Sequence, residues 1–118
     1  MEHNTHVYPM PNPELSARRQ ELAPETIRAF REFSREVFTA GALDAKTKQL
    51  IALAVAHVTQ CPYCIRSHTK GALREGAEEK EMMEAIWVAA EMRAGGAVAH
   101  SVIALEEMEA AAASGQPA

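Results

Sequence analysis

Two cysteines and a histidine stand close together near the middle of the chain. Cys61 and Cys64 are the only cysteines of the sequence, and His68 follows four residues after the second. On a helix, steps of three and then four residues return to nearly the same face, so the three side chains would form one stripe. Two thiols and an imidazole on one face can carry out redox chemistry or hold a metal ion.

The redox interpretation depends on where this stripe lies in its helix. Pro62 suits a first helical turn, which predicts that a helix starts at the cysteine pair. Unpaired N–H groups and the helix dipole stabilise a thiolate there, and His68 can accept the proton. A sulfenic acid on one cysteine can then be attacked by the other, which forms a disulfide. Exposure favours Cys61 as the first nucleophile and contact with His68 favours Cys64, so the sequence leaves the order open.

Metal binding and inert packing are the alternatives for the same residues. Together with His57, the stripe supplies two sulfurs and two nitrogens, the ligand count of a structural zinc site. A tetrahedral site needs ligands that converge from different directions, whereas three of these would lie along one helix. Cysteines are also often plain core residues, but a helix start and a histidine in register do not fit plain packing. We therefore expect neither a metal nor another cofactor.

The composition restricts the classes of partner. The net charge of −4 and the scattered basic residues leave no basic patch, and an aromatic content of 5% is too low for a base-stacking surface. We therefore expect no nucleic-acid partner. The longest apolar run, residues 50–58, is too short to cross a bilayer, and residues 1–13 lack the apolar segment of a secretory signal. These features predict a cytoplasmic protein with no membrane partner, where a cysteine pair is more often catalytic or metal-binding than structural.

Helical periodicity and helix-ending residues divide the chain into elements. Six segments carry helix-start signals or apolar residues at helical spacing: 13–21, 24–39, 45–59, 62–74, 78–94 and 97–113. Asp44 is a suitable N-cap for the third, whose apolar residues nearly surround it and predict a central helix buried on more than one side. Gly76 should end the fourth, and Gly95-Gly96 should break the next or let helices approach closely. Since no stretch alternates with period two, we predict an all-α bundle of about five or six helices.

The two ends of the chain differ from the helical region. Residues 1–12 contain prolines that discourage a helix, so we predict an irregular arm in which His3 and His6 are solvated. Residues 114–118 should form a frayed tail. Residues 13–113 are predicted to form a single domain, because 118 residues suit one modest core. The many alanines limit how much core each helix buries, and apolar surface left over would favour oligomers.

Several groups of residues are similar to those of one known family: Asp44–Ala56, Cys61–Ile65, His68–Leu73, Gly76-Ala77 and Glu84 to Ala89. Over about residues 25–110 the chain resembles the carboxymuconolactone decarboxylase/AhpD-like alkylhydroperoxidase family. This resemblance implies an AhpD-like helical fold that assembles as a homotrimer or homohexamer. It also implies a peroxidase that reduces hydroperoxides and is restored by a dithiol protein or a small thiol. The decarboxylase branch lacks the cysteine pair, which points away from lactone decarboxylation.

The chain departs from the peroxidase pattern at two positions. Gln49 stands twelve residues before Cys61, where the resemblance implies a relay glutamate, and Tyr63 stands where a histidine is expected. A glutamine can hold a hydrogen-bond network but cannot take up a proton. His57 could substitute as the base, or it could be a core histidine bonded to a carbonyl; Glu91, His100 and Glu106 are more remote candidates. We expect a thiol peroxidase or disulfide oxidoreductase of weak activity, with a non-enzymatic redox sensor or scaffold as the alternative.

Overall fold

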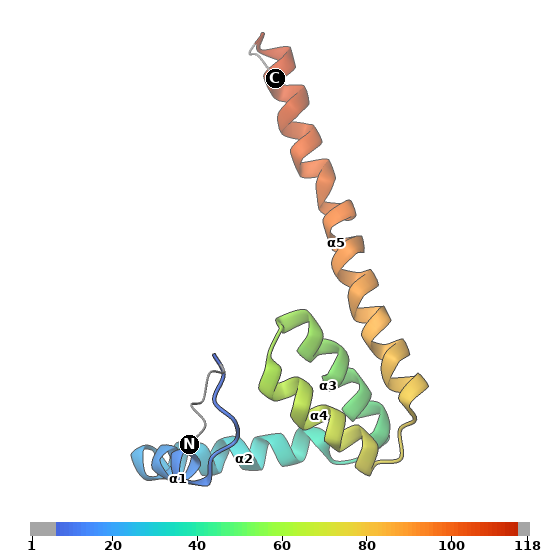
Figure 1. Cartoon of the computed structure of the whole chain (residues 1–118). Helices are drawn as coiled ribbons and strands as arrows, with labels where there is room; N and C mark the ends of the chain where they lie inside the picture. The colour runs from blue at the N-terminus through green and yellow to red at the C-terminus, as the bar shows by residue number, and fades with distance from the viewer. Residues whose placement is uncertain (1–6, 116–118) are drawn as a thin grey trace. The chain divides into compact units, whose positions relative to one another are not determined.

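The structure, a computed structural model, describes residues 7–115, which form helices and turns and no strand. The helices are α1 (Pro13–Leu22), α2 (Pro24–Phe38), α3 (Ala45–Thr59), α4 (Pro62–Arg74) and α5 (Glu79–Ala113), as Figure 1 shows. The predicted all-α class, with about five or six helices, is confirmed. Of the predicted arm, residues 7–12 contain no helix, while His3 and His6 lie outside the described residues, as do residues 116–118 of the tail.

The chain divides into two compact units, Met1–Lys48 and Gln49–Ala118. The single domain predicted for residues 13–113 stays a prediction. In the first unit α1 contacts α2. The Asn12 side chain caps α1 by accepting a hydrogen bond from the backbone N–H of Glu14 at 2.9 Å. Lys48 Nζ donates to the carbonyl oxygens of Val37 and Thr39, which occupies acceptors at the C-terminal end of α2.

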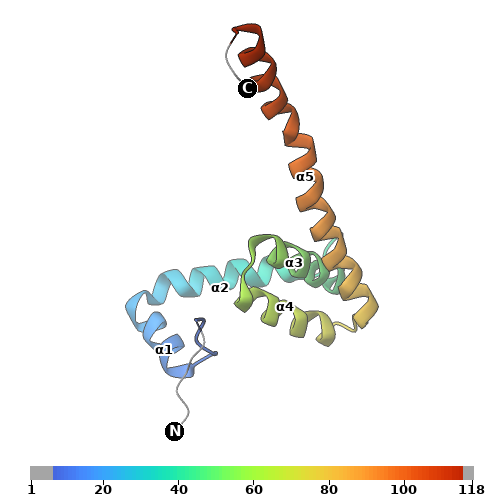
Figure 2. The ribbon, with the colours of Figure 1, turned by 45° about the horizontal axis from the view of Figure 1, so that its top comes forward.

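The core of the second unit is built by α3, α4 and the first turns of α5. The buried residues of this core come from all three helices and the α4–α5 loop: Leu53, Ala72, Ala77 and Met82. Leu50 and Ile86, which are partly buried, pack against them. Figures 1 and 2 both show α3 and α4 side by side. Ile51 and Val55 on α3 are about half exposed. The prediction that this helix is buried on more than one side is therefore wrong for a single chain, because Leu53 and Ala56 are buried while Ile51, Val55 and Val58 stay exposed.

The predicted start and end signals of α3 and α4 are found in the structure. Asp44 accepts a hydrogen bond from the backbone N–H of Thr47 at 2.7 Å, as an N-cap does. Gly76 follows α4 with φ of +84°, a left-handed conformation that glycine adopts without steric cost. The α3–α4 hairpin thus has the limits predicted for it, and these limits place Cys61 at the start of α4.

The prediction of a helix break at Gly95-Gly96 is wrong. A single helix of 35 residues, α5, runs through both glycines. A glycine in a helix interior costs about 1 kcal/mol relative to alanine, and the flanking Ala, Met and Arg residues are strong helix formers. Without a proline, this cost is too small to end the helix. Within residues 7–115, no helix is long and apolar enough to cross a membrane.

Candidate active site

A tight connection places Cys61 at the N-terminus of α4. Gln60 has φ of +57°, the only positive value among the described non-glycine residues, and it turns the chain out of α3. Cys61 is the N-cap of α4, and its sulfur accepts a hydrogen bond from the backbone N–H of Cys64 at 3.3 Å. Pro62 occupies the first turn, as predicted. The sulfur therefore lies where unpaired helix N–H groups favour negative charge.

The two thiols differ in acidity because a hydrogen bond joins their side chains. The hydrogen bond from the Cys64 thiol lowers the pKa of Cys61, and backbone N–H groups of Cys64 and Tyr63 lower it further. The same hydrogen bond raises the pKa of Cys64, and burial of that sulfur adds to the effect. Of the two thiols, Cys61 is therefore the one that ionises more readily, and Cys64 is the one that holds its proton more strongly.

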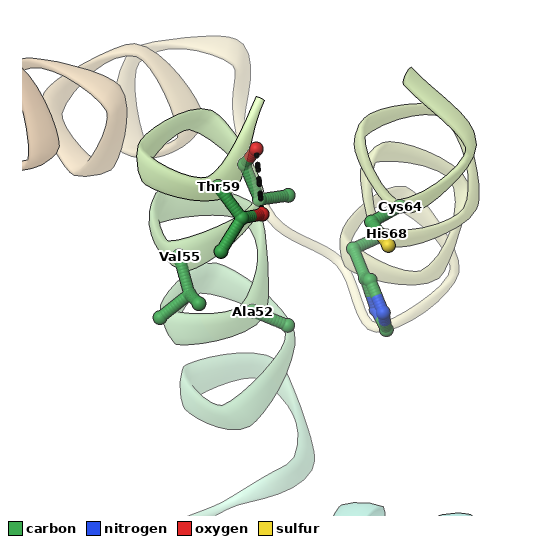
Figure 3. Close-up of a pocket in the computed structure, with 6 residues that line it drawn as sticks. Ala52, Val55, Thr59, Cys64 and His68 are labelled. Carbon is green, nitrogen blue, oxygen red and sulfur yellow. Dashed lines mark hydrogen bonds between the residues drawn. The ribbon is translucent and has the colours of Figure 1, made fainter. Parts of the chain in front are cut away.

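Cys64 and His68 open onto a pocket between α3 and α4. Figure 3 shows both side chains on α4, facing α3. The pocket has a volume of about 290 Å³. Its α3 wall is formed by small or apolar residues: Ala52, Val55, Ala56 and Thr59. The Thr59 hydroxyl in this wall donates to the Ala56 carbonyl, so its proton is already engaged by the helix backbone. A small molecule with an apolar group fits a pocket of this kind beside the thiol and the imidazole.

Gln49 and His68 are joined across the two helices. Nδ1–H of His68 donates to Oε1 of Gln49 at 2.8 Å. This bond fixes the tautomer of a neutral ring, in which Nε2 carries the lone pair and can accept a proton. Burial lowers the pKa of His68, which keeps the ring neutral at pH 7. The imidazole is therefore held in the form that a general base requires.

The other predicted relay residues have different surroundings. His57 Nδ1–H donates to the Leu53 carbonyl at 2.8 Å, one turn earlier on α3, and His57 does not line the pocket. This is the arrangement of a histidine satisfied by its own helix. Tyr63 is 42% exposed on α4. His100 Nδ1–H donates to the Gly96 carbonyl.

None of the three candidates on α5, Glu91, His100 and Glu106, lines the pocket. Among residues 7–115, no three His, Cys, Asp or Glu side chains are grouped so that they could hold a metal ion.

The α3 wall of the pocket was not predicted from the sequence. Its four residues follow the spacing i, i+3, i+4 and i+7, so they occupy one helix face. Three of them, Ala52, Ala56 and Thr59, are small. A stripe of small residues in a helix next to a reactive pair is a signal of close approach that could have identified this wall.

The chain has relatives in bacteria and archaea. A model of the carboxymuconolactone decarboxylase family matches residues 24–107. A protein encoded in the cox locus of Paracoccus denitrificans is 64% identical over 81 residues, which are 69% of this chain and 73% of that protein. A solved protein from Methanobacterium thermoautotrophicum has a TM-score of 0.67 and 36% identity, covering 70% of this chain and 93% of its own.

Two other solved structures carry family descriptions. A carboxymuconolactone decarboxylase family protein from Legionella pneumophila has a TM-score of 0.65 and 33% identity, covering 81% of this chain and 86% of its own. One from Thermotoga maritima, with a suggested part in an antioxidative response, has a TM-score of 0.52 and 30% identity, covering 71% and 93%. The family model spans well over half of the chain, and the solved relatives share its helices. The chain therefore belongs to the carboxymuconolactone decarboxylase family.

Proposed function

We propose that this protein is a thiol peroxidase that reduces hydroperoxides through the Cys61–Cys64 pair, with His68 as the proton-transferring group. One observation carries the proposal: a sulfur of lowered pKa at a helix N-terminus lies beside a second thiol, and that thiol shares a pocket with a neutral histidine. The antioxidative role suggested for the Thermotoga relative supports the same chemistry.

In the first step, the Cys61 thiolate attacks the hydroxyl oxygen of the hydroperoxide. A sulfur–oxygen bond forms as the oxygen–oxygen bond breaks, so the sulfur is oxidised to a sulfenic acid. The leaving alkoxide takes a proton from water and departs as the alcohol. Cys61 is assigned this role because its pKa is lowered and that of Cys64 is raised. This assignment chooses between the two orders that the sequence leaves open.

In the second step, Cys64 resolves the sulfenic acid. Nε2 of His68 accepts the Cys64 proton as that sulfur attacks Cys61, and a disulfide forms. Hydroxide leaves Cys61 and takes the proton back from His68 as water. An external dithiol, from a protein or a small molecule, then reduces the disulfide by two exchange steps and is itself oxidised. The thiolate is thereby restored.

Trapping of the sulfenic acid tests the proposal. Cys64→Ser cannot resolve the intermediate, so an alkyl hydroperoxide added with dimedone should leave a dimedone adduct on Cys61, visible by mass spectrometry. Cys61→Ser should give less adduct on Cys64, because burial of that sulfur still raises its pKa when the Cys61 thiol is gone. An adduct on Cys64 alone would reverse the order of attack. Wild-type protein that keeps both thiols in hydroperoxide would overturn the function.

A redox sensor is the second candidate function, and Gln49 is the observation that favours it. The residue bonded to His68 is an amide, which cannot take over the proton that the imidazole accepts. A pair that oxidises once and is reduced slowly can report on peroxide without consuming it. Peroxide consumption in excess dithiol separates the two: a peroxidase removes many equivalents per chain, and a sensor removes about one.

A further inference from the structure

Gln49 reaches His68 through space that a side chain at position 71 would fill. Gly71 is buried in α4, three residues after His68. A Cβ atom placed on Gly71 would lie 2.6 Å from Cδ and 3.1 Å from Nε2 of Gln49, with Oε1 still nearer. Such separations are well inside van der Waals contact. The carboxamide of Gln49 therefore packs directly on the backbone of Gly71.

The backbone conformation does not explain a glycine at this position. Gly71 lies within α4 and is not among the glycines of positive φ, which are Gly76 and Gly115. Glycine is unfavourable inside a helix, so its presence here has another physical reason. Gly96 provides a contrast, because a Cβ there would meet no atom within 4 Å. Close approach of the Gln49 side chain is the feature that distinguishes position 71.

We propose that Gly71 is a positioning residue for the thiol chemistry. Because Gly71 has no side chain, the carboxamide of Gln49 can pack against its backbone. The carboxamide in turn holds His68 as the Nδ1–H tautomer. That tautomer presents the Nε2 lone pair for the Cys64 proton. Gly71 acts through Gln49, and it is not among the residues that line the pocket of Cys64 and His68. The role in proton transfer rests on the proposed function. The packing of Gln49 against Gly71 and the tautomer of His68 do not depend on it.

A methyl group at position 71 should displace Gln49 from His68. The atoms that it meets belong to the end of a flexible side chain, so Gln49 can rotate away while α4 keeps its path. His68 Nδ1–H then loses this acceptor, and with it the hydrogen bond that favours the Nδ1–H tautomer. Loss of this bond should shift the tautomer population of the His68 ring away from the Nδ1–H form. Gly71→Ala should therefore reproduce the effect of deleting the Gln49 carboxamide.

Nitrogen-15 NMR of the imidazole, recorded on the full reduced chain above pH 7, measures this directly. Long-range correlations distinguish a protonated Nδ1 from a protonated Nε2, and His68→Gln identifies the His68 signals. Wild type should show His68 with Nδ1 protonated. Gly71→Ala and Gln49→Ala should both lose that pattern to a similar extent. The matched control Gly96→Ala should keep it, since it adds the same methyl group to a helix without a clash.

The double variant Gln49→Ala/Gly71→Ala completes the test. It should show the tautomer of Gln49→Ala with no further change, because the two positions act through one hydrogen bond. If Gly71→Ala does not fold, a folded double variant still supports the proposal. Removal of the Gln49 carboxamide would then have relieved the clash with the methyl group at position 71. The proposal is overturned if Gly71→Ala keeps the wild-type tautomer, or if the double variant also fails to fold. The readout needs no peroxide, so a peroxidase assay that failed would leave this result intact.

Discussion

The acidity of Cys61 depends on the donors that surround its sulfur. The Cys64 thiol is the strongest of them, and the backbone N–H of Cys64 adds to it. A substitution at Cys64 that removes only the thiol should therefore raise the pKa of Cys61 without moving the helix. This separates the effect of the neighbouring side chain from that of the helix N-terminus.

Cys64→Ala and Cys64→Ser form a matched pair for this purpose. Alanine has no donor, so the pKa of Cys61 should rise, while the serine hydroxyl should retain part of the stabilisation. The pH dependence of alkylation by iodoacetamide reports the pKa of the one remaining thiol. An alanine variant that titrates below the serine variant would contradict the effect assigned to the hydrogen bond between the two side chains.

The pH dependence of stability follows from the lowered pKa of His68. The unfolded ring titrates near the model value of 6.5, and burial lowers the pKa in the folded chain. Between these two values the unfolded state binds more protons. The contribution of neutral His68 to the free energy of unfolding is therefore fully present above about pH 6.5. It is lost as the pH falls from there through the lowered pKa of the folded chain.

His68→Gln should remove this part of the pH dependence. Urea unfolding of wild type should show a free energy that declines from pH 7.5 towards pH 5, and the variant should decline less steeply. Other groups titrate in the same window, so the comparison between the two proteins is the informative quantity. Equal slopes would show that His68 is as well hydrated in the folded chain as in the unfolded one.

At the scale of the helices, the glycines have distinct roles that substitution can separate. Gly96 lies inside α5 with open space where a Cβ would be, so Gly96→Ala should stabilise the protein by about 0.5–1 kcal/mol. Gly76 has φ of +84°, so Gly76→Ala should destabilise it by about 1–2 kcal/mol. Thermal unfolding followed by circular dichroism measures both. A destabilised Gly96→Ala would show that α5 is not continuous there.

The helices show what local sequence signals can and cannot predict. Asp44, Pro62 and Gly76 act on their own helix ends, so the limits of α3 and α4 could be predicted from them. The effect of Gly95-Gly96 was overestimated, because the glycine penalty competes with a long run of helix formers. Spacing within one helix was enough to predict that Cys64 and His68 lie on the same side of α4, whereas Cys61 precedes the helix as its N-cap.

Helical periodicity does not predict which residues of two different helices are in contact. Position 49 was singled out through the family resemblance, and its hydrogen bond to His68 joins residues nineteen apart in sequence. The packing of Gln49 against Gly71 depends on how closely α3 approaches α4. The spacing of residues within one helix does not specify that distance. The order of the two cysteines likewise depends on which sulfur receives the helix N–H groups.

At the scale of the whole molecule, α5 carries an apolar face with no partner in the single chain. Met82 and Ala89 are buried on its core side. The opposite side presents large apolar residues at helical spacing: Trp87, Val98, Val102 and Leu105. Their exposed fractions run from 52% to 72%. Exposed apolar residues that share one face of a helix are typical of a surface that other protein covers.

We propose that copies of this chain cover the apolar face of α5, in a homotrimer or homohexamer. Light scattering coupled to size-exclusion chromatography should give a molar mass of three or six times the 12.9 kDa of one chain. Val102→Glu, which places a charge in this face, should shift the population to smaller species. Glu107→Gln, on another side of the helix, is the matched control and should leave the assembly unchanged. A wild-type monomer at micromolar concentration would contradict the proposal.

Reduction of hydroperoxide by the cysteine pair can be measured by counting the thiols lost against the peroxide consumed. Reduced wild type is mixed with a limiting amount of an alkyl hydroperoxide, and free thiols, alcohol product and intact mass are measured together. We expect two thiols lost and one alcohol formed per peroxide, with a disulfide between Cys61 and Cys64 of the same chain. Peroxide that persists while both thiols remain reduced would contradict this expectation.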